Sequence, residues 1–179
     1  MPASRRLVAF VAAIDRLTAA VGSAVMWCLL AMVLVQVTVV LMRYVLGVGS
    51  IWLGEAIVYA HATLLMAAAA WTLRCGGHVR VDIFYADAAP RTRAIVDLIG
   101  ALLLLLPFVG MLAWVSLPYV ARSWAIFERS REASGLPLVF LLKTLIPLFA
   151  LLLAVQGLAQ AARAWLVLAR GAAPHEPAP

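Results

Sequence analysis

The sequence predicts an all-α membrane protein with four transmembrane helices, and this prediction rests on composition and on the pattern of hydropathy. Of its 179 residues, 66% are apolar and only 12% are charged, and the mean hydropathy is +1.04. Soluble domains usually carry about a quarter charged residues. A soluble core of this size cannot hide so much apolar surface, so lipid is the solvent that suits the chain.

Four long apolar runs supply the membrane spans. Each run is long enough, because a helix needs roughly 20 apolar residues to cross a hydrocarbon core of about 30 Å. Backbone groups inside lipid must bond to one another, which favours helices. We expect one domain over residues 1–170, followed by a disordered tail at 171–179. The predicted spans are residues 17–42, 51–73, 98–121 and 136–162.

The distribution of basic residues predicts that both termini lie in the cytoplasm. Four spans place both termini on one side of the membrane, together with the second loop. That side would carry nine arginines, against four on the other side, or five basic residues if Lys143 reaches outward. Basic residues concentrate on the cytoplasmic side. The net charge of +6 therefore fits membrane orientation better than nucleic-acid binding.

Two segments outside the spans are expected at the membrane interface. Residues 4–17 repeat apolar side chains at helical spacing, which is typical of an amphipathic surface helix, although an extension of the first span explains the pattern as well. Asp15 and Arg16 interrupt its apolar stretch, so we expect this segment to stay in the mature chain. Pro90 suits the first turn of a helix that leads into the third span.

Tryptophan placement supports the predicted boundaries, because tryptophan favours the membrane–water interface. Trp52 begins the second span, and other tryptophans lie near the ends of the spans. Trp27 and Trp114 lie deeper, so we expect these two side chains to pack between helices.

Glu55 and Lys143 are charged residues inside predicted spans, and such residues are functional candidates that usually have a partner. Both lie roughly 6–10 Å below the outer ends of their helices, at 1.5 Å per residue. This depth permits an ion pair between them. It equally permits each side chain to reach water separately.

His61 lies deeper in the second span than Glu55. A four-helix haem protein would need a second histidine at membrane depth, whereas His78 lies in a loop and His175 in the tail. We therefore interpret His61 as a hydrogen-bonded packing residue. The cysteines show no metal-site spacing. The sequence predicts no catalytic residue, no substrate-binding residue, no metal and no cofactor.

The fourth span carries a polar face. Gln156 and Gln160 are four residues apart and share one side of the helix, with Gly157 beside them. Amides and small residues both favour helix–helix contact in lipid. The contact is either internal or with a second protein, and the sequence leaves this choice open.

The loop after the second span is the densest polar feature of the chain. Its glycines can end the second helix. His78, Arg80 and Asp82 then alternate with valines, so an extended segment would direct them to one side. A well-capped cytoplasmic turn explains the same residues.

Several short motifs occur in an order that resembles a known family. Trp52-x-x-Glu55 starts the second span, the segment 77–82 follows it, and Pro90-Arg91 precedes the third span. Residues 135–137 (Gly-Leu-Pro) then lead into residues 143–147 (Lys-Thr-Leu-Ile-Pro) on the fourth span. With this order and four spans, roughly residues 17–165 resemble the small membrane subunit of tripartite ATP-independent periplasmic (TRAP) transporters, the DctQ-like family.

The resemblance implies a non-enzymatic scaffold subunit in the bacterial inner membrane. Its partners would be a large membrane subunit that carries a carboxylate solute with Na⁺, a periplasmic solute-binding protein, and membrane lipids. The small subunit would brace the large one and hold no substrate site. The lack of a pair of broken helices agrees with this, because transport cores often contain such pairs.

Two other functions fit a four-helix membrane protein. A redox subunit of the cytochrome b type is disfavoured because a second intramembrane histidine is missing. A self-sufficient small channel or exporter could use Glu55 to line a pore in a homo-oligomer. Haem absorption would indicate the first of these, and transport by the chain alone would indicate the second.

Overall fold

The computed structural model describes residues 2–78, 85 and 87–170, and it describes side chains from residue 5 to residue 169 within these ranges. Within these residues there is no strand, and four helical segments are long and apolar enough to cross a membrane. The predicted all-α fold with four transmembrane helices is confirmed. The elements are α1 (Pro2–Val45), α2 (Ile51–Arg74), α3 (Pro90–Ile99), the π-helical turn η1 (Gly100–Leu105), α4 (Leu106–Ala125) and α5 (Val139–Arg170).

Helix α1 is continuous and longer than a bilayer core. Its 44 residues extend about 66 Å at 1.5 Å per residue. Arg43 follows Asp15 by 28 positions (43 minus 15), or about 42 Å. This matches the ~40–45 Å thickness of a bilayer with its head groups. Residues 4–17 therefore extend the first span and form no separate surface helix, and Val11 and Ile14 in this segment are buried.

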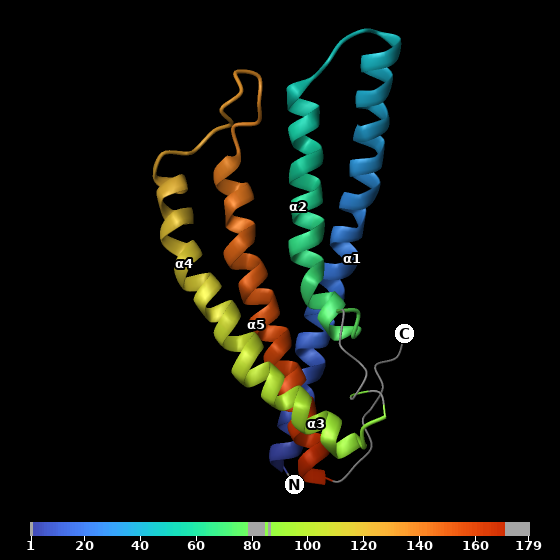
Figure 1. Ribbon diagram of the computed structural model, residues 1–179, viewed down its shortest axis with the longest axis vertical. Coiled ribbons are helices and arrows are strands. Elements are labelled where there is room, and N and C mark those ends of the chain that lie inside the picture. Colours follow the sequence, from blue (N-terminus) through green and yellow to red (C-terminus); the bar gives the residue numbers. More distant parts are fainter. Residues whose placement is uncertain (1, 79–84, 86, 171–179) are drawn as a thin grey trace.

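The helices form two hairpins, α1–α2 and α4–α5, and α5 is the central helix. Helix α5 lies against each of the other helices, whereas no described Cα atom of α4 lies within 8 Å of one in α1 or α2. In Figure 1 the long helices converge toward the end where the chain begins, and α4 leans away from α1 and α2 at the other end. Helix α5 therefore joins the α1–α2 hairpin to the α3–α4 segment.

Close packing at glycine fixes two of these helix pairs. A Cβ atom on Gly22 of α1 would lie 2.7 Å from Cγ of Trp71 on α2. A Cβ atom on Gly157 of α5 would lie 2.8 Å from Cδ2 of Leu105, which belongs to the π-helical turn η1. This wider turn ends two residues before Pro107, whose ring and missing N–H disturb regular helical bonding.

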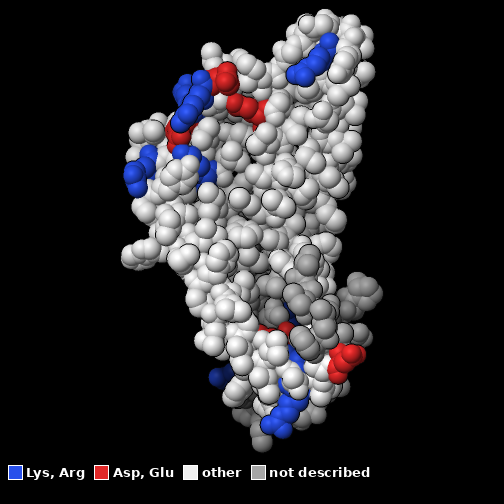
Figure 2. Space-filling model, viewed as in Figure 1, with Lys and Arg blue, Asp and Glu red and all other residues white. Residues whose placement is uncertain are grey.

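Charged side chains gather at the two ends of the molecule, and the face in Figure 2 shows an uncharged belt between them. This belt matches the hydrocarbon core of a membrane. Trp27 and Trp114 lie on the surface, at 71% and 81% exposure. The prediction that these two tryptophans pack between helices is wrong, because each points away from the bundle.

Pro90 begins α3, as the sequence predicts. Arg80, Asp82 and the tail at 171–179 lie outside the described residues, so the predictions for the polar loop and the tail stay predictions.

Candidate functional site: two polar contacts between the hairpins

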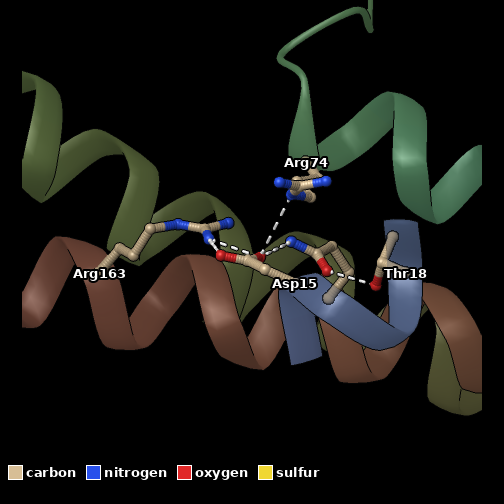
Figure 3. Close-up of polar contacts among 5 residues, drawn as sticks. Asp15, Thr18, Arg74 and Arg163 are labelled. Carbon is tan, nitrogen blue, oxygen red and sulfur yellow. Dashed lines mark hydrogen bonds and ion pairs between the residues drawn. The ribbon is translucent and has the colours of Figure 1, made fainter. Parts of the chain in front are cut away.

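Asp15, in the N-terminal part of α1, is the centre of a polar cluster (Figure 3). One guanidinium nitrogen of Arg163, Nη1, donates to both carboxylate oxygens of Asp15, at 2.8 and 2.9 Å. Arg74 at the end of α2 places its Nε 3.8 Å from Oδ1 of Asp15, which is ion-pair distance without a hydrogen bond. One carboxylate therefore joins α1, α2 and α5.

Gln156 of α5 extends this cluster into the bundle. Its amide nitrogen donates to Oδ1 of Asp15 at 3.2 Å, and its amide oxygen accepts from the Thr18 hydroxyl at 2.8 Å. The Gln156 side chain is fully buried, and Thr18 is 3% exposed. Buried amides in lipid need such partners. We call these five residues (Asp15, Thr18, Arg74, Gln156 and Arg163) the Asp15 cluster.

Helical spacing explains why these residues meet. Asp15 and Thr18 are three residues apart on α1, and Gln156 and Arg163 are seven apart on α5, so each pair shares one helix face. Gly22 continues the α1 face by one turn and lets Trp71 of α2 approach. The cluster carries two guanidinium charges and one carboxylate, and its charged side chains are 24–34% exposed. It can hold three helices together and leaves one net positive charge near the membrane boundary.

Glu55 makes the second contact between the hairpins, at the opposite end. Its carboxylate accepts hydrogen bonds from the Ser130 hydroxyl and from the backbone N–H of Leu136, the latter at 2.6 Å. Both donors lie in the loop between α4 and α5. A Cβ atom on Gly135 would lie 2.5 Å from Cβ of Ser130 and 2.7 Å from Oε1 of Glu55, so a larger residue there would displace these groups. Glu55 therefore ties the start of α2 to this loop.

The ion pair between Glu55 and Lys143 that their depth permits does not form, and neither side chain is left to reach water alone. Lys143 Nζ instead lies 2.5 Å from Oε2 of Glu128 and 4.1 Å from the ring centre of Tyr119. Loop residues supply nearer partners than the other helix does, and depth in the membrane alone does not fix direction around a helix. The hydrogen bond from Lys143 lowers the pKa of Glu128 below its usual range.

An aromatic group shapes the loop that holds Glu128. Phe127 has φ of 44°, a left-handed backbone conformation that residues other than glycine rarely adopt. Its ring makes edge contacts with Trp124 and Phe140, at 6.5 and 5.7 Å between ring centres. These contacts hold the turn after α4, and the turn sets Glu128 next to Lys143 at the top of α5.

The polar face predicted on the fourth span is resolved as an internal contact. Gln156 and Gly157 are buried against α1 and the π-helical turn, so they cannot serve a second protein. Gln160 is half-buried. Of the other predicted contact residues, Trp52 is 50% exposed at the start of α2, and His78 is exposed after it.

His61 departs from its predicted role. It is exposed on α2 and makes no hydrogen bond with a described residue, so it is not a packing residue. The described residues contain no group of three or more His, Cys, Asp or Glu that could hold a metal ion.

Sequence reasoning missed Asp15, Arg74 and Arg163 as a group, because it assigned them to the water-facing boundary. One signal was present. Asp15 lies just before the first apolar run and Arg163 just after the fourth, so both lie at the same depth on the same side.

These features define a multi-pass membrane protein whose four spans are tied together by polar contacts at both ends. The sequence model of one family, "Tripartite ATP-independent periplasmic transporters, DctQ component", matches residues 32–167. The chain belongs to this family, and it is a transporter component of the inner membrane. No curated protein and no solved structure matched the chain.

Proposed function

We propose that the chain is the small, non-enzymatic membrane subunit of a TRAP-type secondary transporter, and that it braces a large transport subunit. In this proposal the transporter takes up a carboxylate solute with Na⁺, and a periplasmic binding protein delivers the solute. Family membership supports the coarse assignment. The scaffold role is supported by the charged residues inside the spans, because they bond to other parts of the same chain.

The observation that carries the scaffold role is that Glu55 and Lys143, the charged residues inside the predicted spans, both have partners in the described chain. Lys143 is bonded to Glu128, and Arg163 is bonded to Asp15. A site for a planar carboxylate needs a free cationic group, best supplied as a guanidinium fork. The charged residues inside the spans bond to other parts of the same chain and hold its helices together, which is what a scaffold requires.

Reconstitution tests this proposal. We expect that the chain alone in liposomes transports nothing under an ion gradient, that it co-purifies with a large membrane permease, and that Na⁺-driven uptake needs both subunits and the binding protein. Uptake by the chain alone, above that of empty liposomes, would overturn the scaffold role in favour of a small channel. A haem absorption band in the purified chain would favour a redox subunit.

Orientation in the membrane is a separate part of the proposal. Reporter fusions at Gly49 and Gly135 should be active as periplasmic fusions, and fusions at Ala86 and Ala173 as cytoplasmic fusions. The reverse pattern would contradict the cytoplasmic placement of both termini.

A further inference from the structure

His61 is a polar side chain that the fold exposes in the middle of a membrane span. It follows Ile51, the first residue of α2, by ten positions and precedes Arg74, the last, by thirteen. These separations correspond to about 15 and 20 Å along the helix axis. The short imidazole cannot reach water from this depth. In the isolated chain it therefore faces hydrocarbon without a hydrogen bond, which is an unfavourable place for a polar group.

The surroundings of His61 form a narrow outward stripe. Apart from Trp52 at the helix start, the exposed residues of α2 are Ile51, Val58, His61 and Leu65. Their spacing of seven, three and four places them on one side of the helix. The other sides of α2 contact α1 and α5. We call these four residues the α2 stripe, and it is the face that α2 presents outward.

Lipid suits three members of the α2 stripe and does not suit the fourth. Acyl chains match Ile51, Val58 and Leu65, but they offer no partner to an imidazole. A second transmembrane helix matches all four residues if it carries a hydroxyl, an amide or an unbonded backbone carbonyl opposite His61, because polar side chains in lipid bond across helix interfaces.

We propose that the α2 stripe is the surface on which a helix of the large membrane subunit docks, with His61 hydrogen-bonded to a polar group of that helix. This inference rests on the proposed function, since the family's transporters are tripartite and so supply a partner. The Asp15 cluster and Glu55 act on the inward sides of the helices, so docking here leaves both contacts intact.

Photo-cross-linking in the assembled complex tests the location. Benzoylphenylalanine replaces Val58 or Leu65 in the full chain, which is expressed with the large subunit, and His61 stays native. The same probe replaces Leu34 of α1 as a reference position, because Leu34 is also exposed, at 59%. We expect cross-links from both α2 positions to the large subunit, in higher yield than from position 34.

Substitution of His61 tests the hydrogen bond. His61→Leu should weaken the complex about fivefold, as expected for an interhelical hydrogen bond in lipid, and His61→Gln should retain most of the affinity. Neither variant should change the melting temperature of the chain alone, because the side chain has no partner within it.

The outcomes separate this inference from the function on which it rests. If the complex forms but the α2 probes cross-link only to a second copy of the chain, or to no protein, the docking surface is wrong and the transporter subunit stands. Equal affinity of the His61→Leu and wild-type complexes would also overturn the inference. If no complex forms with any permease, the proposed function fails and the inference fails with it.

Discussion

Arg163 and Asp15 are 148 positions apart in the chain, and a single nitrogen of Arg163 donates to both carboxylate oxygens of Asp15. Arg74 adds a second positive charge at 3.8 Å from the same carboxylate. The ion pair thus joins the beginning of the chain to its last helix. Its strength can be measured directly, because the partners are single residues on separate helices.

Asp15→Asn should destabilise the protein, because it leaves two guanidinium groups facing each other without their counter-charge. We expect a loss of about 1–2 kcal/mol, less than for a fully buried pair since the side chains keep partial exposure to water. Thermal melting in detergent measures the loss. Arg16→Gln is the control, because Arg16 is the next residue of α1 and is exposed. Equal effects of the two substitutions would contradict a structural role for Asp15.

Gln156→Leu and Gln160→Leu should differ in their effect on stability, although the two residues are one helical turn apart. Gln156→Leu leaves the buried Thr18 hydroxyl without its acceptor, so we expect a loss of about 1 kcal/mol, whereas Gln160→Leu should be close to neutral. Adding Thr18→Val to Gln156→Leu should recover part of the loss, because both polar partners are then gone. A double variant no more stable than Gln156→Leu would show that the hydrogen bond is not the cause.

Lys143 should be energetically coupled to Glu128 and much less to Glu55. We expect the double variant Lys143→Met with Glu128→Gln to lose less stability than the sum of the single variants. Lys143→Met combined with Glu55→Gln should be closer to additive. A stronger coupling of Lys143 to Glu55 than to Glu128 would instead support an ion pair between Lys143 and Glu55.

The contact between Glu128 and Lys143 also predicts a dependence on pH. The folded-state pKa of Glu128 is lowered by the hydrogen bond from Lys143. A lowered carboxyl pKa contributes stability above the unfolded-state value, near 4.5 for Glu, and loses it as the pH falls through the folded-state value. The stability difference between wild type and Glu128→Gln should therefore be constant near neutral pH and shrink below about pH 4.5. If the stability difference between wild type and Glu128→Gln did not change with pH, the hydrogen bond from Lys143 would not lower the pKa of Glu128.

Gly22→Ala and Gly110→Ala test close packing of helices. A Cβ on Gly22 would press on the rigid ring of Trp71, whereas a Cβ on Gly110 meets nothing within 4 Å. We expect Gly22→Ala to lower the melting temperature. Gly110→Ala should raise the stability by roughly 0.5–1 kcal/mol, because alanine favours the helix. Equal changes in melting temperature for the two substitutions would mean that Trp71 of α2 does not pack closely against Gly22 of α1.

The four spans could be predicted from the sequence because lipid acts on every residue of a run, so the signal adds up over some twenty positions. Contacts between helices depend instead on direction around each axis, which one sequence does not reveal. Glu55 and Lys143 match in depth, yet each bonds to the loop between α4 and α5. His61 was expected to pack inside, although its spacing from Val58 and Leu65 places all three on one stripe.

The Asp15 cluster escaped prediction for a related reason. Charges at the ends of spans usually face water and head groups, so Asp15 and Arg163 looked like boundary markers. Gln156 was recognised as a contact residue because a buried amide in lipid must have a partner. Its partner, Thr18, offered no signal, since a threonine in an apolar run can bond to its own helix.

Because α5 is the helix that touches all the others, the order of synthesis limits when the protein can finish folding. The ribosome delivers α1 first and α5 last. Until residue 163 enters the membrane, Asp15 has only Arg74 as a charged partner in the described chain, and no described Cα atom of α4 lies within 8 Å of the α1–α2 hairpin. The hairpins can enter the bilayer one after another, but assembly of the bundle must wait until α5 has been translated.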